Sequence, residues 1–396
     1  MTKWQTKRLG DFVMFQRGFD LLAKDRTDGN IPVISSSGIT GFHNQFKAKG
    51  EGVIIGRKGT LGTVHYSEQD YWPHDTTLWI TDFKGNLPRF IYYFLPLLQL
   101  KKYDVGSSNP TLNRNYIHEI IATLPPLEEQ QKIAAVLSAL DAKIELNNRI
   151  NAELENLAKT IYDYWFVQFD FPDRNGKPYK SSGGEMVYNK ECDRAIPAGW
   201  EVISIESCCQ IADCLHSKKS DFKFESENYF LLQLENIRDD GLIDLTKKYY
   251  VAKSEYERWI SRIEVMEDDI LITNAGRVAA TAQIPKGLVS GIGRNITAIR
   301  PLSISPTYLF LSFRGVDLNR QIRLNTDSGA FFTSLNVKGI KKLLVVKPPD
   351  EIESKFEKSV YSIRRKRELN SSENQQLTQL RDWLLPMLMN GQISIK

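Results

Sequence analysis

The chain has 396 residues, of which 41% are hydrophobic and 25% are charged, and 52 Lys and Arg against 48 Asp and Glu give a net charge of +4. This composition is typical of a folded protein of two or three domains and excludes an intrinsically disordered chain. It has no apolar run of roughly 18 residues, no apolar signal core at its N-terminus and only four Cys, so we expect a cytoplasmic protein without membrane spans or a disulfide framework.

Residues 1–124 are predicted to form a mixed, strand-rich domain. Short apolar alternations are interrupted by turn residues, as at Asp28-Gly29-Asn30. One apolar run leads into the glycine turn GRKGTLG at 56–62, which places Arg57 and Lys58 where the backbone can approach phosphates. A polar loop, GSSNPTLNRN, follows at 106–115.

The region 125–171 is predicted to contain a long helix, over about 127–166. After Pro125-Pro126, about 40 residues follow without Gly or Pro. Every seventh residue forms one column, the seam of a coiled coil: Ile133, Leu140, Asn147, Leu154 and Ile161. The neighbouring column, three residues further on, is mixed: Val136, Lys143, Ile150 and Leu157. The alternative is an amphipathic helix that packs only on its own domain.

Residues 172–196 are rich in Gly, Ser, Pro and charge, which is typical of an exposed linker. Residues 197–347 again alternate short apolar runs with turns and are predicted to form a second mixed domain. The final region, 348–396, carries a second predicted helix, over about 350–389. Its seam column is Phe356, Ile363, Asn370, Leu377 and Leu384.

The second half of the chain repeats the first. A shift of 223 residues places 125–165 on 348–388 without a gap, and 11 of the 41 positions are identical. The upstream matches, with gaps, are GVIIGRKGT (52–60) with DILITNAGR (269–277), and HDTTLWI (74–80) with RNITAIR (294–300). An internal repeat of this kind predicts two domains of the same fold.

The two helices are expected to pair in antiparallel orientation. Asn147 and Asn370 each lie at the centre of a helix, so they should meet and bond as a register pin. Connectivity favours the antiparallel arrangement, because the second domain begins beyond the end of the first helix and the second helix begins where that domain finishes. We therefore expect an α+β fold: two pseudo-symmetric mixed α/β recognition domains separated by an antiparallel two-helix coiled coil, as in a dumbbell.

Catalytic motifs are not found in this sequence. It contains no GxxxxGK[ST] phosphate loop, and LPPL and KPPD are its nearest approach to the (D/N)PP(Y/F) motif of an adenine methyltransferase. Asp350, Glu353 and Lys355 superficially resemble a PD…ExK nuclease motif, but their spacing is too tight for residues on separate strands. The acids after Pro349 instead suit the first turn of a helix.

The cluster Cys208, Cys209, Cys214 and His216 contains the residue types that bind zinc. Structural zinc usually takes two well-separated ligand pairs, and no second pair exists here. Buried free thiols are therefore favoured, and we expect no metal site.

Two like domains at a fixed separation suggest duplex DNA, whose grooves recur regularly. Residues 1–124 carry 15 basic and 11 acidic residues, whereas 125–171 carry 4 and 8, so the first domain is basic and the first helical region acidic. Polar and basic residues in matching turns are the candidate DNA contacts, although each could simply be a solvated turn residue. The candidates are Arg57, Lys58, His74, Ser107, Ser108, Asn109, Thr111 and Asn113 in the first domain, and Arg277, Arg294, Thr326, Ser328, Thr333, Ser334 and Asn336 in the second.

The segment LPPLEEQQKIAAVLSALDAKIELNNRINAELENL, followed by DYWF, resembles the central conserved region of type I restriction–modification specificity (S) subunits. GRKGTLG, followed by a loop with NPTLN, resembles their target recognition domains. The resemblance covers the whole chain. The second half departs from it with TNAGRVA in place of GRKGTLG and KPPDEIESKF in place of LPPLEEQQKI.

The resemblance implies a non-catalytic subunit. Each recognition domain would read one half of a bipartite sequence in double-stranded DNA, and the helical rod would set the spacer. Methyltransferase (M) subunits, typically two, would dock along the helices and bring S-adenosylmethionine, and restriction (R) subunits would add ATP- and Mg-dependent translocation and cleavage. This chain itself would bind no cofactor. The alternative is an interaction scaffold: a coiled coil with two peptide- or sugar-binding modules and no DNA.

Overall fold

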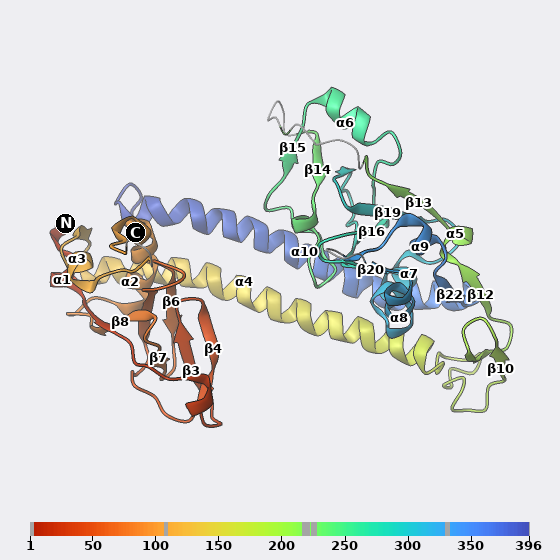
Figure 1. Cartoon of the computed structure of the whole chain (residues 1–396), viewed down its shortest axis with the longest axis horizontal. Helices are drawn as coiled ribbons and strands as arrows, with labels where there is room; N and C mark the ends of the chain where they lie inside the picture. Colours follow the sequence, from red (N-terminus) through yellow and green to blue (C-terminus); the bar gives the residue numbers. More distant parts are fainter. Residues whose placement is uncertain (1–3, 107–109, 216–221, 223–227, 329–332, 396) are drawn as a thin grey trace. The chain divides into compact units, whose positions relative to one another are not determined.

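The computed structural model describes residues 4–106, 110–215, 222, 228–328 and 333–395 (Figure 1). Its contacts divide the chain into two compact units. The first unit comprises residues 1–144 with 377–396, and the second comprises 145–376. Each unit therefore contains one mixed domain and a part of each long helix. None of the described helices is both long and apolar enough to span a membrane.

The first unit contains a four-stranded antiparallel sheet and two smaller pairings. The four-stranded sheet has the order β2 (Met14–Arg17), β8 (Thr77–Asp82), β5 (Gly52–Gly56), β6 (Val64–Ser67). A three-stranded sheet has the order β4 (Gly38–His43), β3 (Ile31–Ser35), β7 (Trp72–Pro73), and β1 (Gln5–Arg8) pairs with β9 (Ile121–Leu124). The short helices are α1 (Leu9–Phe12), α2 (Pro88–Phe94) and α3 (Arg114–His118), with 3-10 turns at Ala23–Asp25, Leu95–Leu98 and Leu100–Tyr103.

The second unit repeats this topology. Its four-stranded sheet has the order β13 (Cys209–Asp213), β19 (Ile296–Pro301), β16 (Ile270–Thr273), β17 (Thr281–Gln283). The smaller pairings are β15 (Tyr249–Tyr250) with β14 (Phe230–Leu232) and β18 (Gly291–Ile292), and β12 (Glu201–Ser204) with β22 (Leu344–Lys347). The helices α5 (Ile205–Cys208), α7 (Pro306–Arg314) and α9 (Val337–Lys341) take the places of α1, α2 and α3. The repeated strand order confirms the internal repeat predicted from the sequence.

Among the described residues, some elements occur in the second unit alone. These are the hairpin β10 (Met186–Asn189) and β11 (Arg194–Pro197) in the linker, the 3-10 turn Leu234–Asn236, the helices α6 (Lys253–Trp259) and α8 (Val316–Leu324), and the hairpin β20 (Asp327–Ser328) with β21 (Thr333–Ser334). The predicted exposed linker thus contains a short antiparallel ladder.

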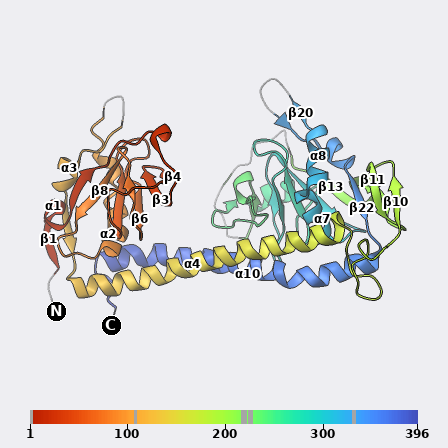
Figure 2. The same cartoon turned by 90° about the horizontal axis from the view of Figure 1, so that it is seen from below.

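The long helices are α4 (Leu127–Tyr162), which continues into a π-helical turn at Asp163–Val167, and α10 (Asp350–Met389). The α4–α10 contacts in the second unit include Asn147 with Asn374 (2.9 Å), Asn151 with Asn370 (2.9 Å) and Glu155 with Arg367 (3.0 Å). Because the α10 numbers fall as the α4 numbers rise, the helices run antiparallel, as predicted (Figure 2).

The ends of both helices are also built into the domain cores. In the first unit, Ile133 and Leu137 of α4 join Leu388 of α10 in one apolar cluster with Phe15 and Phe90. In the second unit, Phe356 and Val360 of α10 pack in the same way with the aromatic residues that end α4. Pairing with the other helix and packing on a domain, which the sequence presented as alternatives, therefore occur together along each helix.

The predicted contact between Asn147 and Asn370 was wrong in detail. Asn147 Nδ2 donates to Asn374 Oδ1 at 2.9 Å, and Asn370 Nδ2 donates to Asn151 Oδ1 at 2.9 Å. The physical reason is that the second buried column lies four residues after the seam, not three. Its members Leu137, Asn151 and Ala158 are buried, whereas Lys143 and Leu157 of the expected column are exposed.

We expect the asparagine pairs to be energetically coupled. Asn370 is 1% exposed and Asn151 5% exposed, so Asn370→Leu leaves the buried amide of Asn151 without its donor and should cost about 1–3 kcal/mol of unfolding free energy. The double substitution Asn151→Leu with Asn370→Leu removes both buried partners, so its cost should be clearly smaller than the sum of the two single costs. Denaturant unfolding of the four proteins measures this, with the exposed Asn156→Leu as control. Additive costs would contradict the coupling.

The first turn of each long helix binds the start of a domain helix, with one difference between the repeats. Gln130 of α4 accepts from Leu87 N at 2.9 Å, just before α2, and donates to Pro125 O at 2.9 Å. Its equivalent in α10 is Glu353, which accepts from Ser305 N at 3.1 Å, just before α7. Glu353 is 7% exposed, and its Oε1 has no hydrogen-bond partner among the described residues.

Burial raises the pKa of Glu353 to about 7, and the nearby carboxylates of Asp350 and Glu357 add to the effect, whereas Lys347 and the Ser305 N–H oppose it. Because the folded pKa lies above the ordinary value of about 4.3, the protonated carboxyl stabilises the fold at acid pH. That contribution is complete below the ordinary value and is lost as the pH rises through about 7.

Glu353→Gln should therefore stabilise the chain at pH 8 and leave its stability near pH 4.5 little changed, because the amide reproduces the neutral group found at Gln130. Thermal unfolding at several pH values between these limits measures the difference. Glu351→Gln is the matched control: this exposed carboxylate has its pKa lowered by Lys355, so its replacement should give no gain at pH 8. Equal effects of the two substitutions across the pH range would count against the buried, neutral Glu353.

Candidate nucleic-acid interface

A polar groove lies at one edge of the large sheet in the first unit. Strands β2 and β5 end at this edge and β8 begins there, because β8 lies between the other two and runs antiparallel to both. The groove has a volume of about 650 Å³. Its lining includes Gln16, Arg17, Asp20, Arg57, Asp75, Thr111, Asn113 and Arg114.

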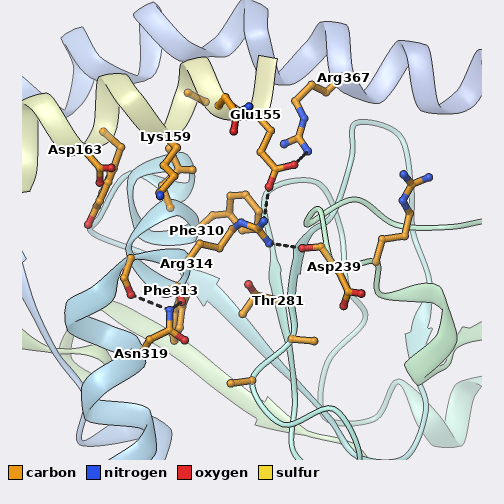
Figure 3. A pocket seen from close by; sticks show the side chains of 18 residues that line it. Glu155, Lys159, Asp163, Asp239, Thr281, Phe310, Phe313, Arg314, Asn319 and Arg367 are labelled. Carbon is orange, nitrogen blue, oxygen red and sulfur yellow. Dashed lines mark hydrogen bonds and ion pairs between the residues drawn. The ribbon is translucent and has the colours of Figure 1, made fainter. Parts of the chain in front are cut away.

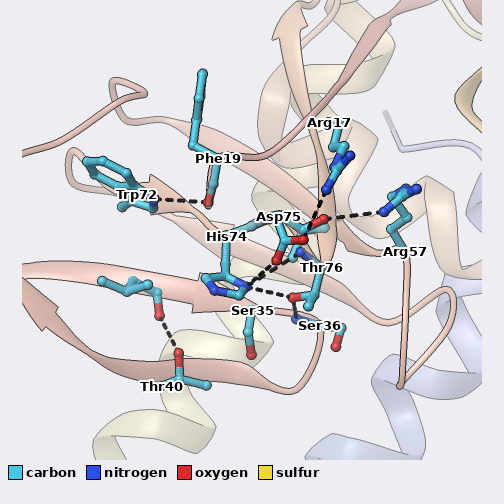
Figure 4. Close-up of polar contacts among 12 residues, drawn as sticks. Arg17, Phe19, Ser35, Ser36, Thr40, Arg57, Trp72, His74, Asp75 and Thr76 are labelled. Atoms are coloured by element: carbon cyan, nitrogen blue, oxygen red, sulfur yellow. Dashed lines mark hydrogen bonds and ion pairs between the residues drawn. The ribbon is translucent and has the colours of Figure 1, made fainter. Parts of the chain in front are cut away.

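Two arginines in this groove are arranged around Asp75 (Figure 4). Arg17 Nη2 pairs with Asp75 Oδ2 at 3.1 Å, and His74 Nδ1 lies 3.1 Å from Asp75 Oδ1. Arg57 Nη1 makes a longer contact of 3.5 Å to the Asp75 carbonyl. Partial burial lowers the pKa of Arg57, and the neighbouring Arg17 lowers it further. Two guanidinium groups are thus held close together, which favours an anionic ligand such as a phosphate or a base edge with paired acceptors.

Most of the described candidates in the first domain lie at or beside this groove. Thr111 lines it, and its backbone forms a bridge to the exposed Lys58. Asn113 also lines the groove, but its Oδ1 accepts from Asn115 N at 3.0 Å and caps α3, so this side chain shapes the turn as well. Ser107, Ser108 and Asn109 lie outside the described residues.

The second domain differs from the predicted match by one residue. Arg57 N bonds Thr76 O, and at the equivalent place Asn274 N bonds Asn295 O. His74 N bonds Ile34 O just as Gly293 N bonds Leu232 O. The sheet register therefore places Gly293, not Arg294, in the position of His74, and Arg294 in the position of Asp75.

This register also shows what replaces Arg57. Asn274 is 7% exposed, donates to Leu335 O at 2.7 Å and accepts from Thr297 Oγ1 at 3.0 Å, so it is a structural residue of the sheet edge. The exposed side chain of Arg294 is a basic group that the second domain offers at this edge. The two domains thus share a framework but present different chemistry.

The other candidates of the second domain are spread over its surface. Arg277 pairs with Asp239 and donates to the carbonyl of Ile237, and it lines a separate groove of about 850 Å³. Thr326 Oγ1 donates to Ile322 O at 2.5 Å. Asn336 caps α9 by accepting from Gly339 N at 2.8 Å, as Asn113 caps α3. The backbones of Ser328, Thr333 and Ser334 belong to the β20–β21 hairpin.

Several residues at the first groove were missed from the sequence. Arg17 and Asp75 form its central pair, and Arg114 lines its rim. The signal for Arg17 was the glycine that follows it: a Cβ at Gly18 would lie 2.1 Å from His74 O, so the chain passes very close to the next strand there. A four-residue strand was too short for its period to identify Arg17 as a groove residue.

The groove could also be considered for a metal ion, since ligand atoms of Asp20, His74 and Asp75 lie within 4.8 Å of one another. However, Arg17 already pairs with Asp75, and the adjacent guanidinium groups disfavour a cation. In the second domain, Cys208, Cys209 and Cys214 are buried and form no disulfide among the described residues, while His216 lies outside them.

Comparisons with known proteins agree with this architecture. A family model described as a type I restriction modification DNA specificity domain matches residues 1–156. The HindI specificity subunit of Haemophilus influenzae is 25% identical over 361 residues, covering 78% of this chain and 78% of the relative. The MjaIX specificity subunit of Methanocaldococcus jannaschii is 25% identical over 333 residues, covering 79% of this chain and 70% of the relative.

The same fold occurs in a solved structure. The crystal structure of a type I restriction–modification S subunit from M. genitalium aligns over 98% of this chain and 96% of its own, with a TM-score of 0.64 and 15% identity. The repeated topology and the antiparallel helices thus occur together with sequence similarity to type I restriction–modification specificity subunits, over residues 1–156 for the family model and over more than three quarters of the chain for both relatives.

Proposed function

We propose that the chain is the DNA sequence-specificity subunit of a type I restriction–modification complex and that each recognition domain reads one half of a bipartite site. The observation that carries this function is the repetition of one sheet topology in both units, each with polar and basic residues at the same sheet edge. A protein with two equivalent readers suits a ligand with two separated half-sites.

In the first domain, Arg17 and Arg57 are positioned to contact the DNA in the groove, and Asp75 fixes their geometry. The exposed Lys58, Lys101 and Lys102 would contact phosphates and set the position of the duplex. Specificity would come from base-edge contacts, each worth about 1–3 kcal/mol for a good bidentate pair. In the second domain, Arg294 would take part in the equivalent contact with a different base preference.

The paired helices would set the spacer and dock the M subunits. Exposed leucines recur at repeat-equivalent positions: Leu146 (48%) with Leu369 (57%), and Leu157 (48%) with Leu380 (44%). Apolar residues exposed in pairs support two equivalent docking places and hence two M subunits. Those M subunits would bind S-adenosylmethionine and flip the target base. The R subunits would use ATP and Mg and cleave the DNA. The complex would act in the cytoplasm.

The alternative, a coiled-coil scaffold that does not bind DNA, is not favoured, because the relatives over most of the chain are DNA specificity subunits. The two functions differ in a simple binding experiment. A complex of this chain with its methyltransferase partner should retain DNA in a salt-dependent manner and should methylate one bipartite sequence. A complex that assembles but neither retains nor methylates DNA would favour the scaffold.

The glycine turn supplies a sharper test in the first domain. Arg57→Ala with Lys58→Ala removes two cations at the groove, so DNA binding by the assembled complex should weaken and the slope of log K against log salt should fall by about 1–2. Affinity measured over a salt series gives both quantities. Lys84→Ala is the matched control, because this exposed lysine bonds Gly10 O at 2.6 Å, away from the groove lining. An unchanged affinity and salt slope in the double variant would remove this turn from the interface.

A further inference from the structure

In each unit, one carboxylate of α4 bonds both α10 and a helix of the recognition domain. In the first unit, Asp141 Oδ1 pairs with Arg381 of α10 at 2.8 Å, and its Oδ2 accepts from Tyr93 Oη of α2 at 2.5 Å. In the second unit, Glu155 Oε2 pairs with Arg367 of α10 at 3.0 Å, and its Oε1 pairs with Arg314 at the end of α7 (Figure 3). Each carboxylate thus connects α4 with α10 and with a domain helix, which is α2 in the first unit and its equivalent α7 in the second.

We call the contacts of Asp141 and the contacts of Glu155 the two ties. The internal repeat does not relate one tie to the other. Under the 223-residue shift, Asp141 corresponds to Arg364 and Glu155 to Thr378, so neither carboxylate has an acidic equivalent. Instead, Glu155 lies 14 residues after Asp141 on α4, and Arg367 lies 14 residues before Arg381 on α10. The same arrangement has therefore arisen twice, at places separated by four turns of each helix.

Both ties are partly sheltered from solvent, and the side chains of Asp141 and Arg381 are 29% and 31% exposed. The side chain of Arg367 is 9% exposed, and those of Glu155 and Arg314 are 27% and 25% exposed. Ion pairs in such positions are screened less than surface pairs, and removing one partner leaves an uncompensated charge. A pocket of about 390 Å³ beside Glu155, lined by Lys159, Asp163 and residues of α7, is not filled by side chains. Bonds to Glu155 therefore add to the packing of Tyr162 on α7, which holds the neighbouring part of the domain to α4.

We propose that Asp141 and Glu155 are positioning residues that fix the angle of each recognition domain on the helix pair, and so restrict the spacer lengths that the subunit accepts. This inference rests on the proposed function. The contact at Glu155 is supported by a second tie on α10, because Arg364 pairs with Asp268 and donates to Ile284 O at 3.1 Å. Loss of Asp141 should therefore loosen its domain more than loss of Glu155.

The test uses the complex of the full chain with its methyltransferase partner. DNA substrates keep both half-sites and differ in the spacer by up to three base pairs in either direction. Asp141→Asn and Glu155→Gln should raise the methylation rate at spacers one base pair from the natural length, relative to the natural one, by at least about tenfold for Asp141→Asn and less for Glu155→Gln. The half-site sequences should stay the same.

Asp163→Asn is the matched control, because Asp163 follows α4 directly and lines the same pocket but forms no ion pair among the described residues (Figure 3). Glu155→Asp, which keeps the charge, should restore much of the natural spacer preference. Arg381→Lys and Arg314→Lys supply second variants if a carboxylate substitution prevents folding, and each should broaden the spacer range because lysine lacks the guanidinium fork.

A natural spacer profile in folded, assembled Asp141 and Glu155 variants would overturn the proposal. So would a change in the half-site sequences, which would indicate a disturbed reading surface. If the natural complex itself methylated no bipartite site, the proposed function would fail instead, so the two failures are distinguishable.

Discussion

Each long helix completes a domain core at both of its ends, and the rest of the structure depends on this constraint. Leu388 and Met389, near the C-terminus, are 1% and 4% exposed in the core of the first domain. Burial of large apolar side chains is the dominant stabilising contribution to such a core, at about 1.5–3 kcal/mol for each. The first domain therefore cannot finish its core until α10 is present, and the two ends of the chain fold as one unit.

The same constraint explains why polar residues are tolerated between the helices. The apolar ends give each helix its place on a domain, so the middle of the pair can contain buried asparagines whose amides bond in only one register. The buried Arg367 adds to this selectivity, because it bonds both Glu155 and the Asp240 carbonyl at 2.7 Å. Such contacts add little net stability but penalise every other alignment of the helices.

The repeat and the seven-residue column predicted the fold well. The expected second helix over 350–389 agrees with α10, and the duplicated segments form equivalent strands. The details that failed depend on offsets of a single residue. The second buried column follows the seam by four residues instead of three, which decides whether Asn147 meets Asn370 or Asn374. Arg294 stands in the place of Asp75, not His74, because a sequence match without a sheet register cannot place a short strand to one residue.

The candidate site was harder to predict than the fold. Arg57 and Thr111 belong to turns rich in Gly, Asn and Ser, whereas Arg17 ends a short strand and is marked in the sequence by Gly18 alone. The duplication preserved the framework while the sheet edge diverged, so that Asn274 stands where the first domain has Arg57. The two sheets thus differ in side chains at equivalent edges. Two domains that read different half-sequences require such a difference.

The claim that the two domains read DNA independently is tested most directly by exchanging one of them. Residues 197–347 would be replaced by the corresponding segment of a relative with a known site, and both long helices would be retained. DNA from cells that contain this hybrid and its methyltransferase partner would then be sequenced for methylated bases. We expect one half-sequence to change to that of the relative and the other half-sequence to remain as before. A simultaneous change in both half-sequences, in a complex that still assembles, would contradict independent reading.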